Sequence, residues 1–555
     1  MEKESSSTKK CQIETDLFHT ASGIPVKEIY GPRDIEALDY LGDLGDAGEY
    51  PFTRGKHRGM FRNRRWIERV EVGFGRPTDS RERVKYLHEI GQSDIEFQTD
   101  LPTEMGIDPD HPMAQKETGL EGIPLSSLAD FEEAFEGINI LDHTLSIMTT
   151  HGSGATSLCQ MIGLAEKRGI DPKTLRGSVC SSNPLSHDPW GFPCAQPMDL
   201  SLKLCIDTIE YCAREKLGIY PCSITGYIME QTGINAFQTM AFVMAAGIEI
   251  IERALQRGLR IDEFVSKIIL HLQVGMDFFE NIAKIRALRR MWAKMIRERY
   301  GAKDLKSCTP NIVIRTAGDS LYDRQPTNNI IRVAYEVLAS VLAGVQAIDT
   351  CTFDEPLALP AKGASRIALN TQYIAFYETG VVNTADPLGG SYYVEHLTNK
   401  LESEANQMLK KIEEMGGLIT AYEKGWIEGV LTEAALERHK IIESGEKTVV
   451  GVNKFVIPKE EEESIPIELI SPEAQEEHVM KVKRLKETRD NRKVRQALSR
   501  LFEISPLDKK INVIPAVLDA TRAYATIGEI WGTMRKANGY PYDPFGVIQD
   551  PFLAD

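Results

Sequence analysis

Hydrophobic and polar positions follow a regular rhythm between about residues 90 and 385 of this chain. Short runs rich in apolar and β-branched residues alternate with longer segments in which apolar residues recur at helical spacing. Strand–helix alternation of this kind predicts parallel β-strands joined by helical crossovers. Eight candidate strands follow one another, at residues 93–99, 143–149, 176–181, 222–226, 267–273, 311–316, 345–350 and 379–384.

Eight strand–helix units are the number that a closed barrel requires, so the pattern predicts an α/β fold of the (β/α)8 TIM barrel type. The alternative is an open, doubly wound parallel sheet, which usually has fewer strands. Bulky Val, Ile and Leu normally fill such a barrel. Here polar residues stand on several strands instead: Ser181, Ser223, Thr225, Gln273, Arg315 and Thr316. They either line a central channel or face the outer helices and strand ends, and the pattern leaves both interpretations open.

The segments on either side of this region have a different character. Residues 1–55 are polar and rich in turn signals, which predicts an N-terminal arm that covers the main domain. Residues 56–400 hold the strand–helix units and form the predicted barrel domain. Residues 401–555 carry long helical patterns and end in a tail rich in Pro and aromatic residues, which predicts a helical C-terminal extension.

Composition excludes several classes of function. The 555 residues include 65 Lys and Arg against 81 Asp and Glu, and the net charge of −16 argues against a nucleic-acid binder. The nine Cys show no C-x-x-C spacing, which argues against disulfides and zinc and favours a reducing cytoplasm. The longest apolar runs, such as residues 239–251, stop at 13 residues, and the first residues lack the apolar core of a secretion signal. We therefore expect a cytoplasmic protein with no membrane partner.

Common catalytic motifs are missing from the sequence. The segment 152–157 lacks the third Gly of a dinucleotide loop, and no P-loop, zinc-protease or nucleophile-elbow motif occurs. The eleven His are not spaced as metal ligands, so we predict no metal site. What remains is an unusual segment with six Arg between residues 54 and 69, a candidate anchor for phosphates or a charged helix surface.

Several long segments together resemble the large, catalytic chain of the adenosylcobalamin-dependent acyl-CoA mutases, the methylmalonyl-CoA mutase family. The resemblance runs from about residue 20 to about residue 540. It is carried by YPFTRG (50–55), MFRNRRW (60–66), DLPTEMGIDPDHP (100–112), FDEPLALP (353–360), NTQYIAFYETGVVNTADPLGGSYYVE (370–395) and RAYATIGEI (522–530).

Membership in that family implies the fold, the substrate and the partner. The family's fold is a (β/α)8 barrel lined with small polar side chains, and the pantetheine of an acyl-CoA threads its axis. Adenosylcobalamin sits on a separate flavodoxin-like domain that carries D-x-H-x-x-G, and this chain contains no such motif. The resemblance therefore implies a separate small cobalamin-binding subunit in a heterodimer or heterotetramer. It also implies a radical rearrangement of the acyl carbon skeleton, which the chain alone should not catalyse.

Departures from the family pattern concern the acyl group. Ile228 stands where methylmalonyl-CoA mutases have a His over the thioester oxygen, and Ile cannot donate a hydrogen bond. By position, Trp190 replaces the Arg that grips the free carboxylate, Glu71 replaces a Tyr near the cobalamin, and Gly59 replaces a Thr. Thr99 stands where hydroxyacyl-specific members carry an Asp. An unpaired carboxylate in a dry pocket is costly, so we expect a substrate other than methylmalonyl-CoA.

The site hypothesis combines the retained and the altered positions. Substrate-binding roles fall to His57, Met60, Arg64, Arg69, Glu71, Thr99, Cys180, Trp190 and Asn311. Catalytic roles fall to Ile228, Gln346 and His151, and cofactor-binding roles to Glu71, Gln346 and Glu378. Isobutyryl-CoA or 2-hydroxyisobutyryl-CoA as substrate is one alternative. A non-catalytic structural paralogue in a mutase heteromer is another, although the retained Gln346 and Glu378 speak against it.

His151 and His187 are the two candidates to replace the missing family His. Replacing His151 with Ala is expected to lower turnover, because it would remove the hydrogen bond to the thioester oxygen. Steady-state turnover of the reconstituted enzyme checks this expectation, and an unchanged rate removes His151 from the site.

Overall fold

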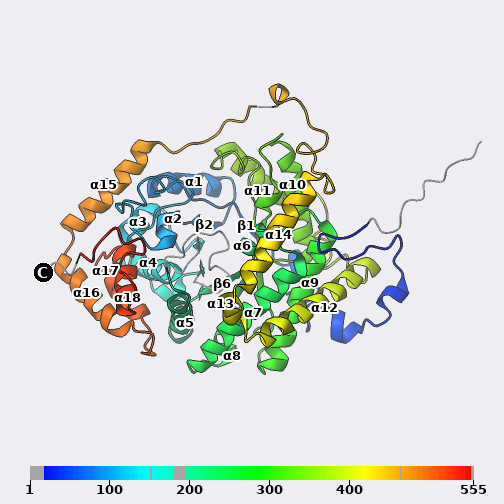
Figure 1. Ribbon diagram of the computed structural model, residues 1–555, viewed down its shortest axis with the longest axis horizontal. Coiled ribbons are helices and arrows are strands. Elements are labelled where there is room, and N and C mark those ends of the chain that lie inside the picture. The colour runs from blue at the N-terminus through cyan, green and yellow to red at the C-terminus, as the bar shows by residue number, and fades with distance from the viewer. Residues whose placement is uncertain (1–17, 150–152, 181–195, 463, 552–555) are drawn as a thin grey trace, which may run out of the picture.

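The computed structural model describes residues 18–149, 153–180, 196–462 and 464–551 (Figure 1). Within these ranges the strands are β1 (Ile67–Arg69), β2 (Asp94–Gln98), β3 (Thr144–Met148), β4 (Gly177–Val179), β5 (Ile219–Tyr220), β6 (Cys222–Thr225), β7 (Ile268–Val274), β8 (Asn311–Thr316) and β9 (Ala347–Asp349). The helices are α1 (Pro77–Glu89), α2 (Leu101–Met105), α3 (Leu128–Ala134), α4 (Gly154–Lys167), α5 (Met198–Glu215), α6 (Tyr227–Gln231), α7 (Ala236–Gln256), α8 (Ile261–Phe264), α9 (Phe278–Lys294), α10 (Asn328–Ala343), α11 (Lys362–Tyr377), α12 (Tyr392–Glu414), α13 (Leu418–Glu423), α14 (Trp426–Glu443), α15 (Pro472–Thr488), α16 (Asn491–Ile504), α17 (Ile514–Arg522) and α18 (Ile527–Ala537). Single turns of 3-10 or π-helix are η1 (Pro32–Ile35), η2 (Tyr40–Leu44), η3 (Met60–Arg62), η4 (Pro172–Thr174), η6 (Val265–Lys267), η7 (Met295–Arg299), η8 (Gly318–Ser320) and η9 (Lys459–Glu461).

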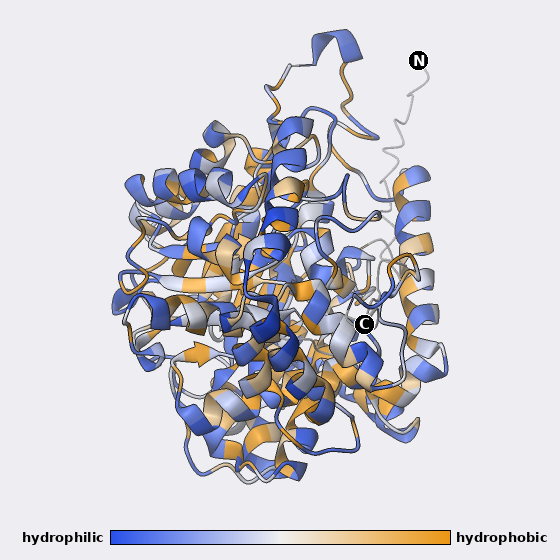
Figure 2. Cartoon of the chain, turned by 90° about the vertical axis from the view of Figure 1, so that its left-hand side faces the viewer, coloured by the Kyte–Doolittle hydropathy of each residue, from blue (hydrophilic) through white to orange (hydrophobic). Residues whose placement is uncertain are grey.

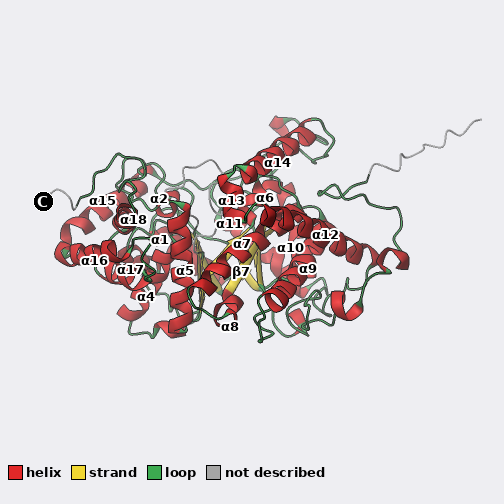
Figure 3. Ribbon diagram, turned by 60° about the horizontal axis from the view of Figure 1, so that its bottom comes forward, coloured by secondary structure: helices red, strands yellow, loops and turns green. Residues whose placement is uncertain are grey.

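The strands form two parallel sheets, which confirms the predicted α/β class. One sheet has the order β2-β3-β4-β5, and the other has the order β1-β9-β8-β7-β6. The two sheets adjoin one another at two places, which we call the seams. Val72, just beyond β1, forms a parallel bridge with Phe97 of β2, and only Pro221 separates β5 from β6. The strands lie at the centre of the molecule with helices on both sides (Figure 3).

Seven of the eight predicted strands are confirmed, and the eighth is wrong. Residues 379–384 form turns after α11, where Gly380 adopts a φ of 74° and the nearby Asp386 a φ of 45°. Such values break a strand and suit Gly and Asp. Two observed strands were not predicted: β5, which has only two residues, and β1, whose sequence Ile-Glu-Arg carries no strand signal of its own. Strand β1 is held by parallel pairing with β9, in the register Ile67 to Ala347.

Apolar residues of the strands and helices gather in two large cores. One joins β6 to β9 with α7, α9, α10 and α12, and includes Phe242, Trp292 and Ile348. The other joins β2 to β5 with α1, α3 and α4, and includes Phe97 and Trp531. Bands of hydrophobic and hydrophilic residues alternate along the helices, which gives them an inward and an outward side (Figure 2). Each fully buried large side chain contributes roughly 1.5–3 kcal/mol.

The C-terminal helices α16, α17 and α18 belong to the second core, and they lie beside α4 and α5 (Figure 1). Helix α18 begins at Thr526, whose backbone N–H donates to Glu529 at 2.8 Å in a capping box. The predicted boundary between residues 400 and 401 falls inside α12, which is continuous from Tyr392 to Glu414. The extension is thus helical as expected, but it shares its core with the strands. None of the described helices combines the length and apolar composition needed to cross a bilayer.

A buried cluster of ion pairs fixes the turn after α11 to the rest of the molecule. Arg286 of α9 is 1% exposed and donates to Asp386 at 2.6 Å and to Glu395 at 2.5 Å. Arg54 of the arm also pairs with Asp386, at 3.1 Å, and Glu395 accepts from Gly390 N at 2.9 Å. Arg286 therefore joins the turn to α12, and Arg54 joins the arm to the same turn.

Replacing Arg286 with Met is expected to destabilise the chain by about 3–5 kcal/mol, because two buried carboxylates lose their main partner. Arg299→Met is the matched control, since Arg299 also bridges two carboxylates, Glu252 and Glu413, but on the surface. It should cost less than about 1 kcal/mol. Urea unfolding of both variants checks this, and equal losses would contradict the account.

Candidate active site

The strands present an apolar face to the helices and a polar face to the space between the two sheets. Residues at alternate positions make up this polar interior: Arg69, Glu71, Asp94, Glu96, Ser146, Ser178, Cys180, Ser223, Thr225, His271, Gln273, Arg315 and Asp349. The interpretation that inward polar residues line a channel is therefore favoured for Ser223, Thr225, Gln273 and Arg315. Thr316 lies on the opposite face, where its Oγ1 accepts from Cys351 N at 2.8 Å, and Ser181 lies outside the described residues.

Arg69 organises the polar interior of β1 to β4. It pairs with Asp94 at 2.5 Å and with Glu96 at 2.7 Å, and it donates to Ser146 Oγ at 3.0 Å. Ser178 extends this hydrogen-bond network, because its Oγ donates to Ser146 Oγ at 3.1 Å. Burial disfavours the charged guanidinium, but the two carboxylates outweigh it and raise the pKa of Arg69. Burial also raises the pKa of Asp94 and that of Glu96.

Arg315 holds the carboxyl groups that lie at the carboxyl ends of β1, β8 and β9. It bonds Glu71, pairs with Asp349 at 2.8 Å and reaches Glu355 at 3.4 Å. The backbone N–H of Glu71 donates to Asp349 at 3.1 Å. Burial, reinforced by the charges of Glu71 and Glu355, raises the pKa of Asp349 to about 7 against the opposing effect of Arg315. Three carboxyl groups thus share one cation.

Basic side chains gather at the amino ends of the strands, and we call the group of Lys56, His57 and Arg64 the cationic mouth. Lys56 bonds the side chain of Asn311, which donates to Ser266 O at 2.9 Å. Burial, followed by the charge of Arg64, lowers the pKa of Lys56 to about 8. His57 and Arg64 are exposed beside it, and burial together with Lys56 and Arg64 lowers the pKa of His57. Lysine and arginine side chains gathered in this way suit the phosphates of a coenzyme.

Met60 is buried where the arm meets the amino ends. It is 5% exposed, its Sδ accepts from His57 N at 3.4 Å, and it lies against Gly55 and Gly344. The structure therefore brings together four of the predicted substrate-binding residues, His57, Met60, Arg64 and Asn311, at one end of the strands.

The three predicted cofactor-binding residues are not brought together. Gln346 precedes β9 at the amino end, where its Oε1 accepts from Ile312 N at 2.8 Å and its Nε2 donates to Gly344 O at 3.0 Å. Glu378 ends α11 and is exposed, near Arg65, which bonds Tyr377 at the same end. Glu71 lies at the opposite, carboxyl end. Only Glu71 therefore faces the end at which the cofactor is expected.

The remaining predicted residues lie at or beyond the carboxyl ends. Ile228 is 8% exposed in the first turn of α6, directly after β6. Thr99 is buried and its Oγ1 donates to Met148 O at 3.3 Å. The Sγ of Cys180 is 3.5 Å from Thr225 Oγ1, and burial raises the pKa of this thiol to about 11. His151, His187 and Trp190 lie outside the described residues.

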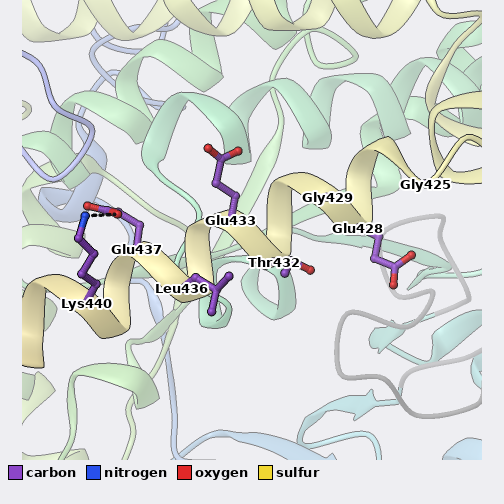
Figure 4. A pocket seen from close by; sticks show the side chains of 8 residues that line it. All are labelled: Gly425, Glu428, Gly429, Thr432, Glu433, Leu436, Glu437 and Lys440. Carbon is purple, nitrogen blue, oxygen red and sulfur yellow. Dashed lines mark hydrogen bonds and ion pairs between the residues drawn. The ribbon is translucent and has the colours of Figure 1, made fainter.

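A separate shallow groove runs along the exposed face of α14 and has a volume of about 570 Å³ (Figure 4). It is lined by Gly425, Glu428, Gly429, Thr432, Glu433, Leu436, Glu437 and Lys440. Arg438 of the same helix pairs with Asp319 and donates to Gln231 O at 3.3 Å, which ties α14 to the loops after β6 and β8. The groove is acidic and open, so it suits an anionic coenzyme less well than the interior does. Across the described residues, no cluster of three or more His, Cys, Asp or Glu is arranged to hold a metal ion.

Comparison with known proteins identifies the family. The family model described as methylmalonyl-CoA mutase matches residues 19–540. The chain belongs to the methylmalonyl-CoA mutase family. It is 35% identical over 540 residues to the 2-hydroxyisobutanoyl-CoA mutase large subunit of Aquincola tertiaricarbonis, covering 95% of this chain and 94% of that one.

Methylmalonyl-CoA mutases themselves are similarly related to this chain. That of Rhizobium meliloti is 35% identical over 526 residues, covering 94% of this chain and 72% of its own. The human mitochondrial methylmalonyl-CoA mutase is 34% identical over 523 residues, covering 94% and 69%. The chain is therefore an isomerase of the acyl-CoA mutase class, a family that depends on adenosylcobalamin.

Sequence reasoning missed several residues of the polar interior and its mouth, among them His271, Asp349 and Lys56. His271 and Gln273 are the two polar residues of β7, two positions apart in a strand of otherwise apolar residues, and this alternation was the available signal. Asp349 ends β9 in the same register as Arg315, which only the strand pairing reveals. Lys56 directly precedes His57, but its contact with Asn311 spans 255 positions and leaves no local pattern.

The raised pKa of Asp349 has a consequence for stability. The folded state binds the Asp349 proton up to about pH 7, whereas the unfolded state releases it near pH 4. The free energy of unfolding should therefore fall as pH rises from about 4 to 7. In Asp349→Asn, the part of this decrease in the free energy of unfolding that comes from Asp349 should be absent. Urea unfolding at a series of pH values would show this. The control, Asp508→Asn on the surface, should keep the slope of the parent chain, and an unaltered slope in Asp349→Asn would contradict the assignment.

Proposed function

We propose that this chain is the acyl-CoA-binding large subunit of an adenosylcobalamin-dependent acyl-CoA mutase that rearranges the carbon skeleton of an acyl thioester other than methylmalonyl-CoA. The observation that carries the proposal is the polar interior, which runs from a cationic mouth at the amino ends to the Arg315 cluster at the carboxyl ends. An extended coenzyme with phosphates at one end and an acyl group at the other matches this arrangement of charge.

The fold we propose for this function is one closed (β/α)8 barrel made from the two sheets. Support comes from both seams, the Val72–Phe97 bridge and the single residue between β5 and β6. Electrostatics adds to it at the first seam, because Asp349 of one sheet acts on the pKa of Glu96 of the other, and Arg69 of β1 pairs with Asp94 and Glu96 of β2. Charged groups that interact across the seam in this way lie in one common interior.

Residues at the carboxyl ends fit a nucleoside cofactor. Glu71 and Glu355 offer acceptors for ribose hydroxyls, and Arg315 Nε is buried without a hydrogen-bond partner among the described residues. These residues would hold the adenosyl group of adenosylcobalamin, which supplies hydrogen-atom abstraction through homolysis of its cobalt–carbon bond. Buried side chains around the interior exclude water from the reacting groups.

We assign the cobalamin-binding domain to a separate small subunit, in a heterodimer or heterotetramer. The name of the relative from Aquincola tertiaricarbonis, a mutase large subunit covered over 94% of its length, supports this. Such an enzyme would operate in the cytoplasm, where acyl-CoA and reduced thiols are found.

The acyl group we favour carries no free carboxylate. Glu71, Asp349 and Glu355 already exceed the single charge of Arg315 at the carboxyl end. A further carboxylate would be desolvated among like charges, at a cost of several kcal/mol. Isobutyryl-CoA and 2-hydroxyisobutyryl-CoA satisfy this constraint and are the alternatives that similarity to the hydroxyacyl mutase supports.

Reconstitution with a small subunit and adenosylcobalamin tests the proposal. A panel of methylmalonyl-, isobutyryl-, 2-hydroxyisobutyryl-, pivalyl- and aryl-substituted succinyl-CoA is screened for cob(II)alamin by electron paramagnetic resonance and for product by mass spectrometry. At least one monocarboxylic acyl-CoA should react, with a kcat/KM at least about 100-fold above that of methylmalonyl-CoA. Omission of the small subunit or of the cofactor serves as the control and should abolish the signal.

Two results would contradict the proposal. Preferential turnover of methylmalonyl-CoA would show that the carboxylate cluster does not select the acyl group. Failure of the complex to bind cobalamin, with no thioester reacting, would favour the structural paralogue of an active mutase chain.

A further inference from the structure

His271 is a buried histidine to which neither the family pattern nor the proposed function has so far given a role. It is the central residue of β7, the fourth of its seven residues, and it is 5% exposed. Its neighbours on the same face are Ile269 towards the amino end and Gln273 towards the carboxyl end. Thr225 of β6 and Val313 of β8 flank it in register. The imidazole therefore lies half-way along the polar interior.

The surroundings of His271 leave its polar atoms free for a ligand. Nδ1 is buried and has no hydrogen-bond partner among the described residues. The ring stacks on Tyr227, with centroids 5.5 Å apart and planes 14° apart, so its orientation is fixed. Burial, followed by the charges of Arg315 and Arg69, lowers the pKa of His271 to about 3. The side chain is therefore a neutral imidazole at physiological pH, with one N–H to donate.

A buried polar atom without a partner is costly, which makes it a sign of a missing ligand group. The depth of His271 indicates which group this is. Phosphates belong at the cationic mouth and the acyl group belongs near Arg315, so the thioester that joins them falls between the two ends. Towards the amino end an apolar cluster lies next to His271, formed by Ile67, Tyr220, Ile269, Val313 and Ala347. A hydrogen bond beside this cluster would be shielded from water.

The backbone connects His271 to the position where the family His is missing. Gly226 N donates to His271 O at 2.8 Å, and Ile228 follows two residues later in the first turn of α6. We propose that His271 contacts the substrate and donates a hydrogen bond to the thioester oxygen of the acyl-CoA, in place of a side chain at Ile228. This inference rests on the proposed function, because it needs an acyl-CoA in the interior.

Paired ligands that differ by one oxygen test the contact. Isobutyryl-CoA and its thioether analogue isobutyl-CoA, which lacks the carbonyl oxygen, are titrated calorimetrically into the full 555-residue chain. The chain should bind the thioester about 10-fold more tightly than the thioether. In His271→Phe, which keeps the ring on Tyr227 but removes the N–H, this ratio should fall to near 1. His271→Asn returns an N–H close to the position of Nδ1 and should restore part of it.

A spectroscopic readout separates the hydrogen bond from a general loss of packing. The thioester carbonyl stretch of bound isobutyryl-CoA should lie at lower wavenumber than in His271→Phe, because hydrogen bonding weakens the carbonyl bond. His143→Phe is the matched control, since His143 is also buried but bonds Ser93 O at 3.2 Å outside the polar interior. It should leave both the binding ratio and the carbonyl band unchanged.

The outcomes distinguish this inference from the proposed function. If the unaltered chain binds neither ligand, both the proposed function and the role of His271 are refuted. If it binds both ligands equally, or if His271→Phe keeps the ratio and the carbonyl band of the unaltered chain, the role of His271 is refuted while the acyl-CoA site stands.

Discussion

The whole arrangement depends on two arginines that hold a surplus of buried carboxylates on the inner face of the strands. Arg69 neutralises Asp94 and Glu96, and Arg315 neutralises part of the charge of Glu71 and Asp349. A charged interior is costly to bury, and it persists because the outer faces of β2 to β9 pack into apolar cores. The helices thus supply the stability, and the interior is left free to bind a polar ligand.

The two ends of this interior differ in charge, and the difference gives the molecule a direction. Lys56, His57 and Arg64 gather at the amino ends, whereas carboxyl groups outnumber cations around Arg315. An anionic coenzyme is drawn to the first end and repelled from the second. The acyl group can then reach the carboxyl end only as the uncharged tip of the molecule, with the thioester at the level of His271. Specificity against free carboxylates follows from the same charges that hold the fold together.

Much of the fold could be predicted from the sequence, because strand–helix alternation is a local signal. It failed at β1, whose strand character comes from pairing with β9, and at residues 379–384, where apolar residues lie in turns. The family resemblance assigned His57, Met60 and Asn311 to the substrate, and the structure places them together at the amino ends. The resemblance also assigned Gln346 and Glu378 to the cofactor together with Glu71, although strand direction places them at opposite ends. Which residues share an interior is a property of register, so His271 and Asp349 became visible only once the strands were paired.

Photoaffinity labelling tests the central claim that an acyl-CoA lies along the polar interior with its acyl group at the carboxyl end. An acyl-CoA with a diazirine in its acyl group would be bound to the chain, irradiated and mapped by peptide mass spectrometry. The account predicts labelled peptides from the inner strands, around residues 69–72, 271–274 and 315–316, with labelling suppressed by excess isobutyryl-CoA. Labelling confined to the groove of α14, at residues 425–440, would contradict it.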